Sequence, residues 1–196
     1  MFAELLRERL GSVIELPPLQ IHQLEKHFDL LNRWNRVLNL TSLKKPEEIV
    51  ERHYCECLFL ATYLPQGSLR IGDIGSGAGF PGIPLAIAKP DYAVTLIESN
   101  QRKSVFLREA ARELANVSVI PARAEEITET FDWVTSRAVR FSEIEKTVAK
   151  LTPNVAILGG AEAPSGNCFT WNSPVTLPWG NQRKLWVGSS FHVKRC

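Results

Sequence analysis

The chain has 196 residues, of which 44% are hydrophobic and 22% are charged, and its formal net charge at pH 7 is +2. Such a chain can bury one good core with a small additional layer, which favours one domain with an extension. The small net charge neither demands nor excludes nucleic acid, so a basic face would require local clustering. No charged leader with an apolar run and no apolar stretch of membrane-spanning length is present, so export and membrane insertion are not expected.

The cysteines favour a reduced, cytoplasmic protein. They are Cys55, Cys57, Cys168 and Cys196, and no pair has the C-x-x-C spacing of a zinc or redox site. We therefore expect no metal site. Nothing in the sequence indicates more than a monomer.

Residues 1 to 65 are predicted to be a helical extension. The apolar spacing predicts helices over Glu4 to Leu10, after Pro17-Pro18, and from Pro46 to about Tyr63. Basic residues of this region stand among a similar number of acids, so a solvated surface and an RNA-facing patch both stay open. They are Arg33, Arg36, Lys44, Lys45, Arg52 and His53.

Residues 66 to 196 alternate strands with helices after the boundary at Pro65-Gln66-Gly67. We expect strands at about 69–74, 92–97, 117–120, 131–135, 155–158, 169–171 and 185–187. Helices are expected up to Ala88, from Asn100 to Leu114 with Ser99 as its cap, and from Phe141 to Leu151. This alternation predicts an α/β fold with a mostly parallel sheet and helices on both faces.

The glycine-rich stretch from Leu69 to Leu85 is the strongest signal for a ligand. It is an apolar run containing Asp73, then a turn with Gly75, Gly77 and Gly79, then the start of a helix. Gly77 to Gly82 satisfies the G-x-G-x-x-G pattern of dinucleotide binders. However, an Asp73 carboxylate beside a nicotinamide cofactor would repel its diphosphate, whereas it suits the cationic S-adenosylmethionine (SAM).

Other polar residues follow the predicted strands. Glu98 ends the second strand and suits the ribose diol of SAM, while Ala124-Glu125 and Arg137 follow the third and fourth strands. In a parallel sheet, ligands bind outside the carboxyl ends of the strands, at the switch in strand order. We therefore expect these residues to converge with Asp73 to Gly79.

Several motifs occur in the order and spacing of one known family. They are Asn39-Leu40-Thr41-Ser42, Pro46-Glu47-Glu48, Arg52-His53, the run from Asp73 to Leu85, and Ser136-Arg137-Ala138. Over about residues 20 to 158 the chain resembles the ribosomal RNA small subunit methyltransferase G family, also called glucose-inhibited division protein B.

The resemblance implies a Rossmann-like, class I SAM-dependent methyltransferase with a mostly parallel seven-stranded sheet. Residues 66–196 would form the SAM-binding domain and residues 1–65 its helical extension. The implied reaction is transfer of a methyl group from SAM to N7 of a guanine, position 527 of 16S rRNA in the small ribosomal subunit.

Site residues follow from the motifs and the resemblance together. Cofactor contacts are expected from Asp73, Gly75, Gly77, Gly79, Phe80, Glu98, Ala124, Glu125 and Arg137. Substrate contacts are expected from Arg123, Arg137, Pro81 and His53. Guanine N7 keeps a lone pair at neutral pH, so no catalytic base is named, and positioning should supply most of the rate. Arg123 and Arg137 have an alternative role, as structural ion pairs with Glu125 or Glu126.

The chain departs from the family pattern near its end. Leu158-Gly159-Gly160 stands where the family usually has Leu-Lys-Gly, and Ala163 to Gly166 gives little helix signal where the family has a helix. The alternatives left open are a SAM-dependent methyltransferase with a small-molecule or protein substrate, a nicotinamide-dependent oxidoreductase, and a non-catalytic RNA-binding module.

Overall fold

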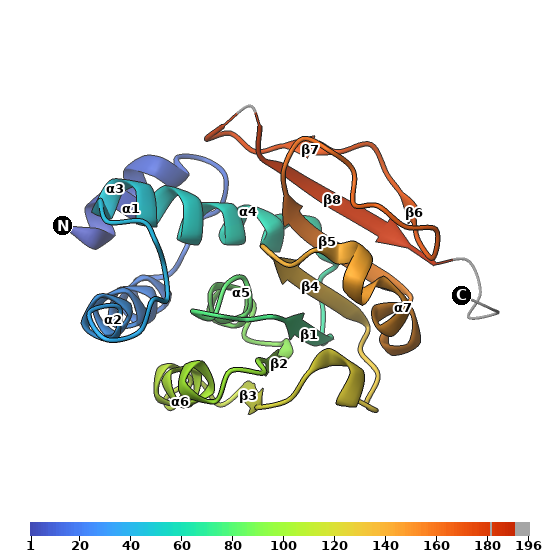
Figure 1. Ribbon diagram of the computed structural model, residues 1–196. Coiled ribbons are helices and arrows are strands. Elements are labelled where there is room, and N and C mark those ends of the chain that lie inside the picture. The colour runs from blue at the N-terminus through green and yellow to red at the C-terminus, as the bar shows by residue number, and fades with distance from the viewer. Residues whose placement is uncertain (181, 191–196) are drawn as a thin grey trace.

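A mixed β-sheet with helices on both faces forms the centre of the computed structural model, which describes residues 1–180 and 182–190 (Figure 1). The helices are α1 (Phe2–Leu10), α2 (Pro18–Trp34), α3 (Pro46–Ile49), α4 (Glu56–Tyr63), α5 (Gly82–Ala88), α6 (Gln101–Ala110) and α7 (Phe141–Leu151). A π-helical turn, η1 (Val50–Cys55), joins α3 to α4, and a 3-10 turn, η2 (Ala124–Glu126), follows β3. The strands are β1 (Arg70–Ile74), β2 (Ala93–Ile97), β3 (Val117–Ile120), β4 (Trp133–Arg137), β5 (Asn154–Gly159), β6 (Thr170–Trp171), β7 (Val175–Thr176) and β8 (Lys184–Ser189).

The sheet order is β3-β2-β1-β4-β5-β8-β6, and β7 also pairs with β8. Strands β1 to β5 are parallel, and β8 runs antiparallel to β5. The order reverses between β1 and β4, which is therefore the switch point where a ligand is expected. The sequence predicted seven strands; the eighth is β7, which is two residues long and too short to leave a periodic pattern.

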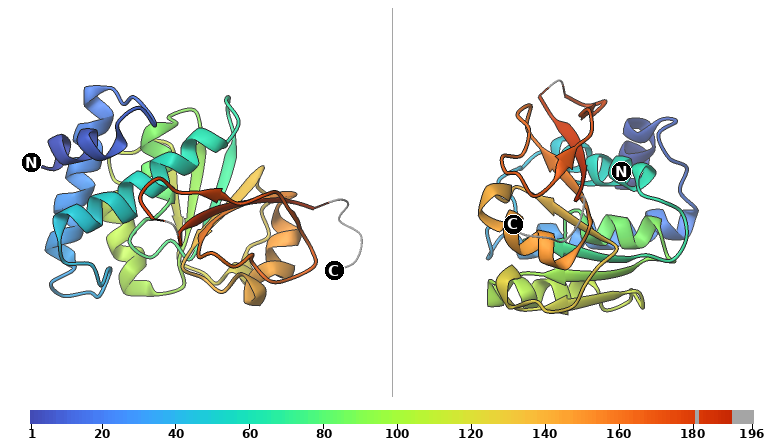
Figure 2. Two further views of the ribbon diagram at one scale, coloured as in Figure 1. Left: turned by 90° about the horizontal axis from the view of Figure 1, so that it is seen from above. Right: turned by 90° about the vertical axis from the view of Figure 1, so that its right-hand side faces the viewer.

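Two hydrophobic clusters line the two faces of the sheet. The larger cluster joins α1, α2, α4, α5 and α6 to the sheet, and the smaller joins η2, α7 and the segment around Phe169 (Figure 2). The larger cluster contains Leu58 and Leu64 from the helical extension together with Ile71 and Leu85. The extension and the sheet thus share one core across the segment at 65–67, and the domain boundary placed there stays a prediction.

The local chemistry explains where two helices begin. Helix α6 is capped by Asn100, whose side chain accepts the backbone N–H of Lys103 at 3.1 Å. The prediction that Ser99 caps this helix was wrong, because an N-cap side chain accepts an amide two or three residues further on, and the residue that does so here is Asn100. Helix α7 buries Phe141, Ile144 and Val148 on one face, which is the spacing that predicted it from the sequence.

No helix joins β5 to β6. Residues 160–169 run as irregular chain over the outer part of the smaller cluster, as the weak helix signal at Ala163 to Gly166 indicated. The buried carboxylate of Glu145 on α7 accepts the backbone N–H of Cys168 at 2.7 Å and so fixes this segment. The irregular chain replaces helical cover on this face.

Candidate functional site

The turn between β1 and α5 is shaped by its glycines. Gly77 has φ of 56°, a left-handed conformation that side chains disfavour. Gly82 begins α5 so close to the sheet that a Cβ there would overlap Leu96 and the Asp73 carboxylate. The start of α5 can therefore sit directly over the ends of β1 and β2 only with glycine at this position.

Asp73 holds this turn from beneath. Its side chain is fully buried, Oδ2 accepts the Gly82 N–H at 3.1 Å, and Oδ1 accepts the Thr135 hydroxyl at 3.2 Å. Burial raises the pKa of Asp73 to about 6, although hydrogen bonds from Ser76, Gly82 and Thr135 act in the opposite direction. The carboxylate thus ties β1 and β4 to the first amide of α5.

Glu98 holds the same turn from the neighbouring strand. It follows β2 and is 7% exposed, with Oε2 accepting the Gly77 N–H at 2.9 Å and Oε1 accepting the Asn100 N–H at 2.8 Å. Its charge also contributes to the raised pKa of Asp73, so the two carboxylates share one region. The predicted convergence of Asp73, Gly77 and Glu98 is seen directly in these bonds.

Two side chains of the helical extension hold the outer side of the turn. His27 on α2 donates from Nε2 to the Ala78 carbonyl at 3.0 Å, and its Nδ1 accepts the Tyr54 hydroxyl at 2.9 Å. Complete burial lowers the pKa of His27 to about 4, so the ring is neutral at pH 7. The Phe80 ring is buried and stacks on His53 with 4.7 Å between ring centroids. Helical extension and glycine turn therefore form one unit.

Arg137, the last residue of β4, lies at the centre of a buried polar network. Its Nη1 donates to Nδ1 of His53 at 2.8 Å, and its Nη2 lies 3.7 Å from Oε2 of Glu56. Glu56 is 2% exposed and also receives two hydrogen bonds from Arg183, at 3.2 and 2.9 Å. Burial and the positive charge of Arg137 lower the pKa of His53 to about 3. Arg137 thus pairs with Glu56 and not with Glu125 or Glu126.

The remaining predicted residues are less closely joined. Ala124 begins η2 and packs in the same cluster as Ile74 and Ile97, at the ends of β1 and β2. The side chains of Arg123 and Glu125 are exposed, and no ion pair of Arg123 is found in the described part of the chain. Pro81 is buried beneath the turn.

Sequence reasoning gave no role to four residues of this region, His27, Glu56, Thr135 and Arg183, and it quoted Thr41 only as part of the Asn39 to Ser42 motif. The four act through partners far away in the chain, whereas Thr41 contacts His53, 12 positions away. A signal existed for one of them, since Glu56 stands one helical turn after His53. No local pattern could indicate that Arg183 crosses 127 positions to reach it.

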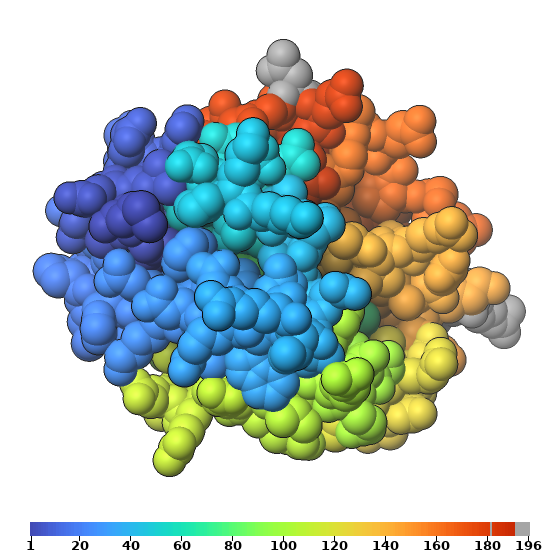
Figure 3. Space-filling model, turned by 60° about the vertical axis from the view of Figure 1, so that its left-hand side comes forward, coloured from blue at the N-terminus to red at the C-terminus, as the bar shows by residue number. Residues whose placement is uncertain are grey.

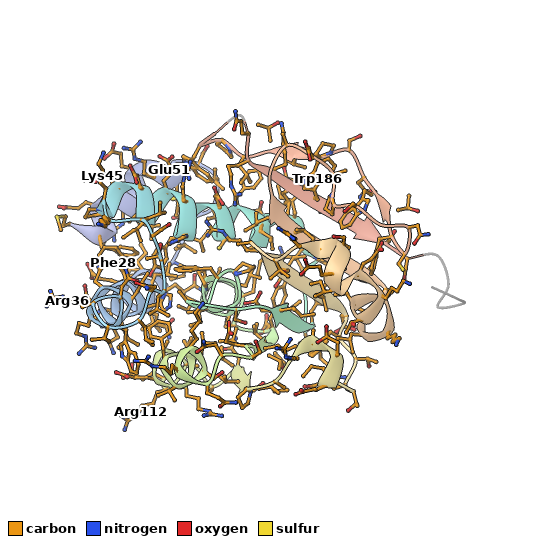
Figure 4. The ribbon with its side chains drawn as sticks, viewed as in Figure 1. Phe28, Arg36, Lys45, Glu51, Arg112 and Trp186 are labelled. Atoms are coloured by element: carbon orange, nitrogen blue, oxygen red, sulfur yellow. The ribbon has the colours of Figure 1, made fainter. Side chains whose placement is uncertain are left out.

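The basic residues of the extension face solvent. Arg33, Arg36, Lys44, Lys45 and Arg52 are all exposed, and Figure 4 shows Arg36 and Lys45 at the outer rim of the molecule. A groove of about 590 Å³ lies between α2 and α6, lined by both signs of charge, including Lys26, Arg33, Glu109 and Glu113. This mixed lining does not favour an RNA-facing patch over a solvated surface.

Neither a metal nor a membrane feature is found in residues 1–180 and 182–190. No group of three or more metal-ligating side chains occurs there. None of the helices in those ranges combines the length and the apolar character needed to cross a membrane.

Comparison with known proteins decides the family. The family model described as "GidB: rRNA small subunit methyltransferase G" matches residues 20–158. The chain belongs to this family. The rRNA small subunit methyltransferase G of Chromobacterium violaceum is 37% identical over 182 residues, covering 91% of this chain and 85% of that protein. The one of Halorhodospira halophila is 44% identical over 159 residues, covering 78% and 75%.

Solved structures agree on the fold. The SAM-bound magnesium protoporphyrin IX methyltransferase of Synechocystis PCC 6803 has a TM-score of 0.60 at 16% identity, covering 82% of this chain and 91% of that one. A SAM-dependent methyltransferase of Aquifex aeolicus also has a TM-score of 0.60, at 14% identity, with coverage of 78% and 97%. The predicted class I methyltransferase fold and the predicted membership of the methyltransferase G family are both confirmed.

The family match ends where the irregular C-terminal part begins. Gly159, where the resemblance leads us to expect a lysine, ends β5 beside Trp186, whose indole N–H donates to the Gly160 carbonyl at 3.1 Å. A Cβ on Gly159 would lie 3.6 Å from Trp186 Cδ1, an ordinary contact. The structure therefore has room for a side chain at position 159.

Proposed function

We propose that this protein transfers the methyl group of SAM to N7 of a guanine in 16S rRNA of the small ribosomal subunit. Family membership supports the RNA substrate. The observation that carries the cofactor is the pair of carboxylates, Asp73 and Glu98, that accept amides of the glycine turn.

These two bonds separate SAM from a nicotinamide cofactor. A dinucleotide needs the turn and helix-start amides for its diphosphate. Here the amides of Gly77 and Gly82 are already taken by carboxylates, which would also repel a diphosphate. SAM carries an ammonium and a sulfonium and no phosphate, so the same acidic surroundings favour it.

The acidic residues at the turn suit the positive charge of SAM. The residues that would hold it are Gly75, Gly77, Gly79, Phe80, Glu98, Ala124, Glu125 and Arg137, and Asp73 would act through its charge because its carboxylate is fully buried. Glu98 suits the ribose diol and Arg137 the carboxylate of the methionine part, while Phe80 contributes through the backbone because its ring is packed on His53. When bound, SAM supplies a methyl group on a positively charged sulfur.

His53 is not available as a general base, and the reaction requires none. The Nδ1 of His53 accepts from Arg137, and no basic lone pair remains once Nε2 carries the proton. Guanine N7 attacks the methyl directly with its in-plane lone pair. The protein's contribution is alignment of N7 with the methyl–sulfur bond in surroundings made favourable by Asp73.

The RNA would approach from the β4 side of the switch point, since the β2 side is occupied by Glu98 and the ribose. Substrate contacts are proposed for Arg123, Arg137, Pro81 and His53, with Pro81 acting through the shape of the turn because it is buried. The major groove of A-form RNA is too narrow for side chains, so the target guanine must be unpaired or splayed out. We also expect a monomer that works in the cytoplasm.

Two measurements test the proposal. Calorimetric titration should show binding of SAM and none of NADH; the reverse result contradicts the cofactor assignment. Mapping N7-methylguanine in 16S rRNA from cells with and without the protein should show one site that disappears in its absence. An unchanged methylation map with intact SAM binding would point instead to a small-molecule or protein substrate.

A further inference from the structure

A threonine of the helical extension carries a hydroxyl proton for which the described part of the chain provides no acceptor. The Arg137 guanidinium can only donate, so His53 Nδ1 must accept and its proton must be on Nε2. That N–H donates to Thr41 Oγ1 at 2.7 Å, and the Leu43 N–H donates to the same oxygen at 3.1 Å. Both lone pairs of the hydroxyl are occupied, and no hydrogen bond donated by it is found among the described residues. Thr41 is therefore restricted to the role of donor.

The hydroxyl is also rigidly held. The Asn35 side chain accepts the backbone N–H groups of Leu40 and Thr41 at 2.8 and 3.0 Å, and it donates to the Thr41 carbonyl at 3.0 Å. The His53 ring that contacts the hydroxyl is stacked on Phe80 of the glycine turn. A side chain held this way is suited to selecting a partner, because little entropy is lost on binding.

Thr41 lies on the side where the methyl acceptor must enter. Its contact, His53, joins the glycine turn to Arg137, at the switch between β1 and β4. The cofactor side of that switch is marked by Glu98, so the β4 side remains for the substrate. Figure 3 shows this face, with the light-blue segment that joins α2 to α3 beside the yellow-green and orange segments that follow β2 and β4. Thr41 is half-buried there, with part of its surface open to a ligand.

A donor-only hydroxyl distinguishes the two purines at the edge that carries N7. Guanine presents two acceptors there, N7 and O6, whereas adenine presents N7 and the N6 amino donor. N7 must keep its lone pair for the methyl group, which leaves O6 as the acceptor for the enzyme. We propose that the Thr41 hydroxyl, with both lone pairs occupied by His53 and Leu43, donates to O6 of the target guanine and so selects guanine. This inference rests on the proposed function.

The test is a double-substitution cycle in which residue 41 of the enzyme and the target base of the RNA are changed separately and together. Small subunits are reconstituted with 16S rRNA carrying guanine or 2-aminopurine, which lacks O6, at the target position. The variants are Thr41→Val, which removes the hydroxyl at constant shape, and Thr41→Ser, which keeps it. With guanine, Thr41→Val should lose about tenfold in kcat/KM while Thr41→Ser retains most of it. With 2-aminopurine, Thr41→Val should match the wild type, and SAM affinity should be unchanged in both variants.

Three results would overturn the inference: equal losses on both bases, no loss on guanine, or a parallel loss of SAM affinity. If Thr41→Val does not fold, Thr41→Ala replaces it with the same expected pattern, since it removes the hydroxyl without adding bulk. Failure of the proposed function is recognised separately. In that case the wild-type protein itself transfers no methyl group to guanine-containing subunits.

Discussion

The glycine turn and the segment between β5 and β8, of which residues 160–180 and 182–183 are described, are held in different ways. The turn is fixed by hydrogen bonds to three side chains from different parts of the chain, Asp73, Glu98 and His27. The segment between β5 and β8 has only two-residue strands, β6 and β7, in its described part, and it is anchored by the Glu145–Cys168 hydrogen bond and the Glu56–Arg183 ion pair. The comparison teaches that the turn is held by several converging bonds, whereas the segment between β5 and β8 depends on separate contacts.

Glu56→Ala should therefore have the largest effect. It removes the carboxylate that Arg137 and Arg183 share, and it leaves two guanidinium groups partly buried without a counter-charge. The expected loss in the free energy of unfolding is about 3–5 kcal/mol, measured by urea denaturation. Glu143→Ala is the matched control, because its 3.3 Å pair with Arg140 is exposed and should contribute less than about 1 kcal/mol. Equal losses in the two variants would contradict the role given to Glu56.

Gly82→Ala tests the close packing of the glycine turn against the sheet. The added methyl group would meet Leu96 and the Asp73 carboxylate, so α5 must move away from the sheet. We expect a loss of about 1–3 kcal/mol in the free energy of unfolding and a clear loss of SAM affinity. Gly160→Ala has open space around the new methyl and should stay within about 0.5 kcal/mol of the wild type. A Gly82→Ala protein of normal stability and SAM affinity would refute the close packing as a requirement.

Asp73→Asn keeps the size of the side chain and removes its charge. SAM affinity should fall about tenfold, since one anion near a cationic ligand is lost. In the wild type, SAM affinity should rise with pH through about 6, where Asp73 ionises, and this rise should be absent in Asp73→Asn. Calorimetric titration between pH 5 and 8 measures both, with the exposed Asp91→Asn as control. A variant that binds SAM as the wild type does would remove Asp73 from the cofactor site.

The same group has the opposite effect on stability. The pKa of Asp73 in the folded protein, about 6, lies above the ordinary value of 3.8. The folded state thus keeps a proton that the unfolded state releases, and the contribution of Asp73 to the free energy of unfolding falls as pH rises from about 4 to about 6. Asp73→Asn should flatten that part of the stability profile. Chemical denaturation across this pH range checks the sign.

The features that could be predicted from the sequence are those determined locally or by the strand order, and the contacts between distant residues could not be predicted. The strand that contains Asp73, the helix over Phe141 to Leu151 and the meeting of Glu98 with the turn were predictable because periodicity and parallel topology determine them. The role of Glu56 could not be predicted, since its partners Arg137 and Arg183 are distant in the chain. The path of residues 160–169 depends on the buried Glu145, which no local pattern indicates.

Gly159→Lys introduces the residue expected from the family pattern, at the end of β5, and should have the smallest effect. The side chain fits, because its Cβ would only touch Trp186, and Lys184 already places a cation across the strand pair at this position. Stability should change by less than about 0.5 kcal/mol. If the added cation reaches an RNA phosphate, the slope of log affinity against log salt should steepen by about one. Gly159→Gln, which adds a long side chain without charge, should leave the slope unchanged. Identical slopes for the two variants would mean that the C-terminal end of β5 lies outside the RNA contact, and that a lysine at position 159 would add nothing to substrate binding.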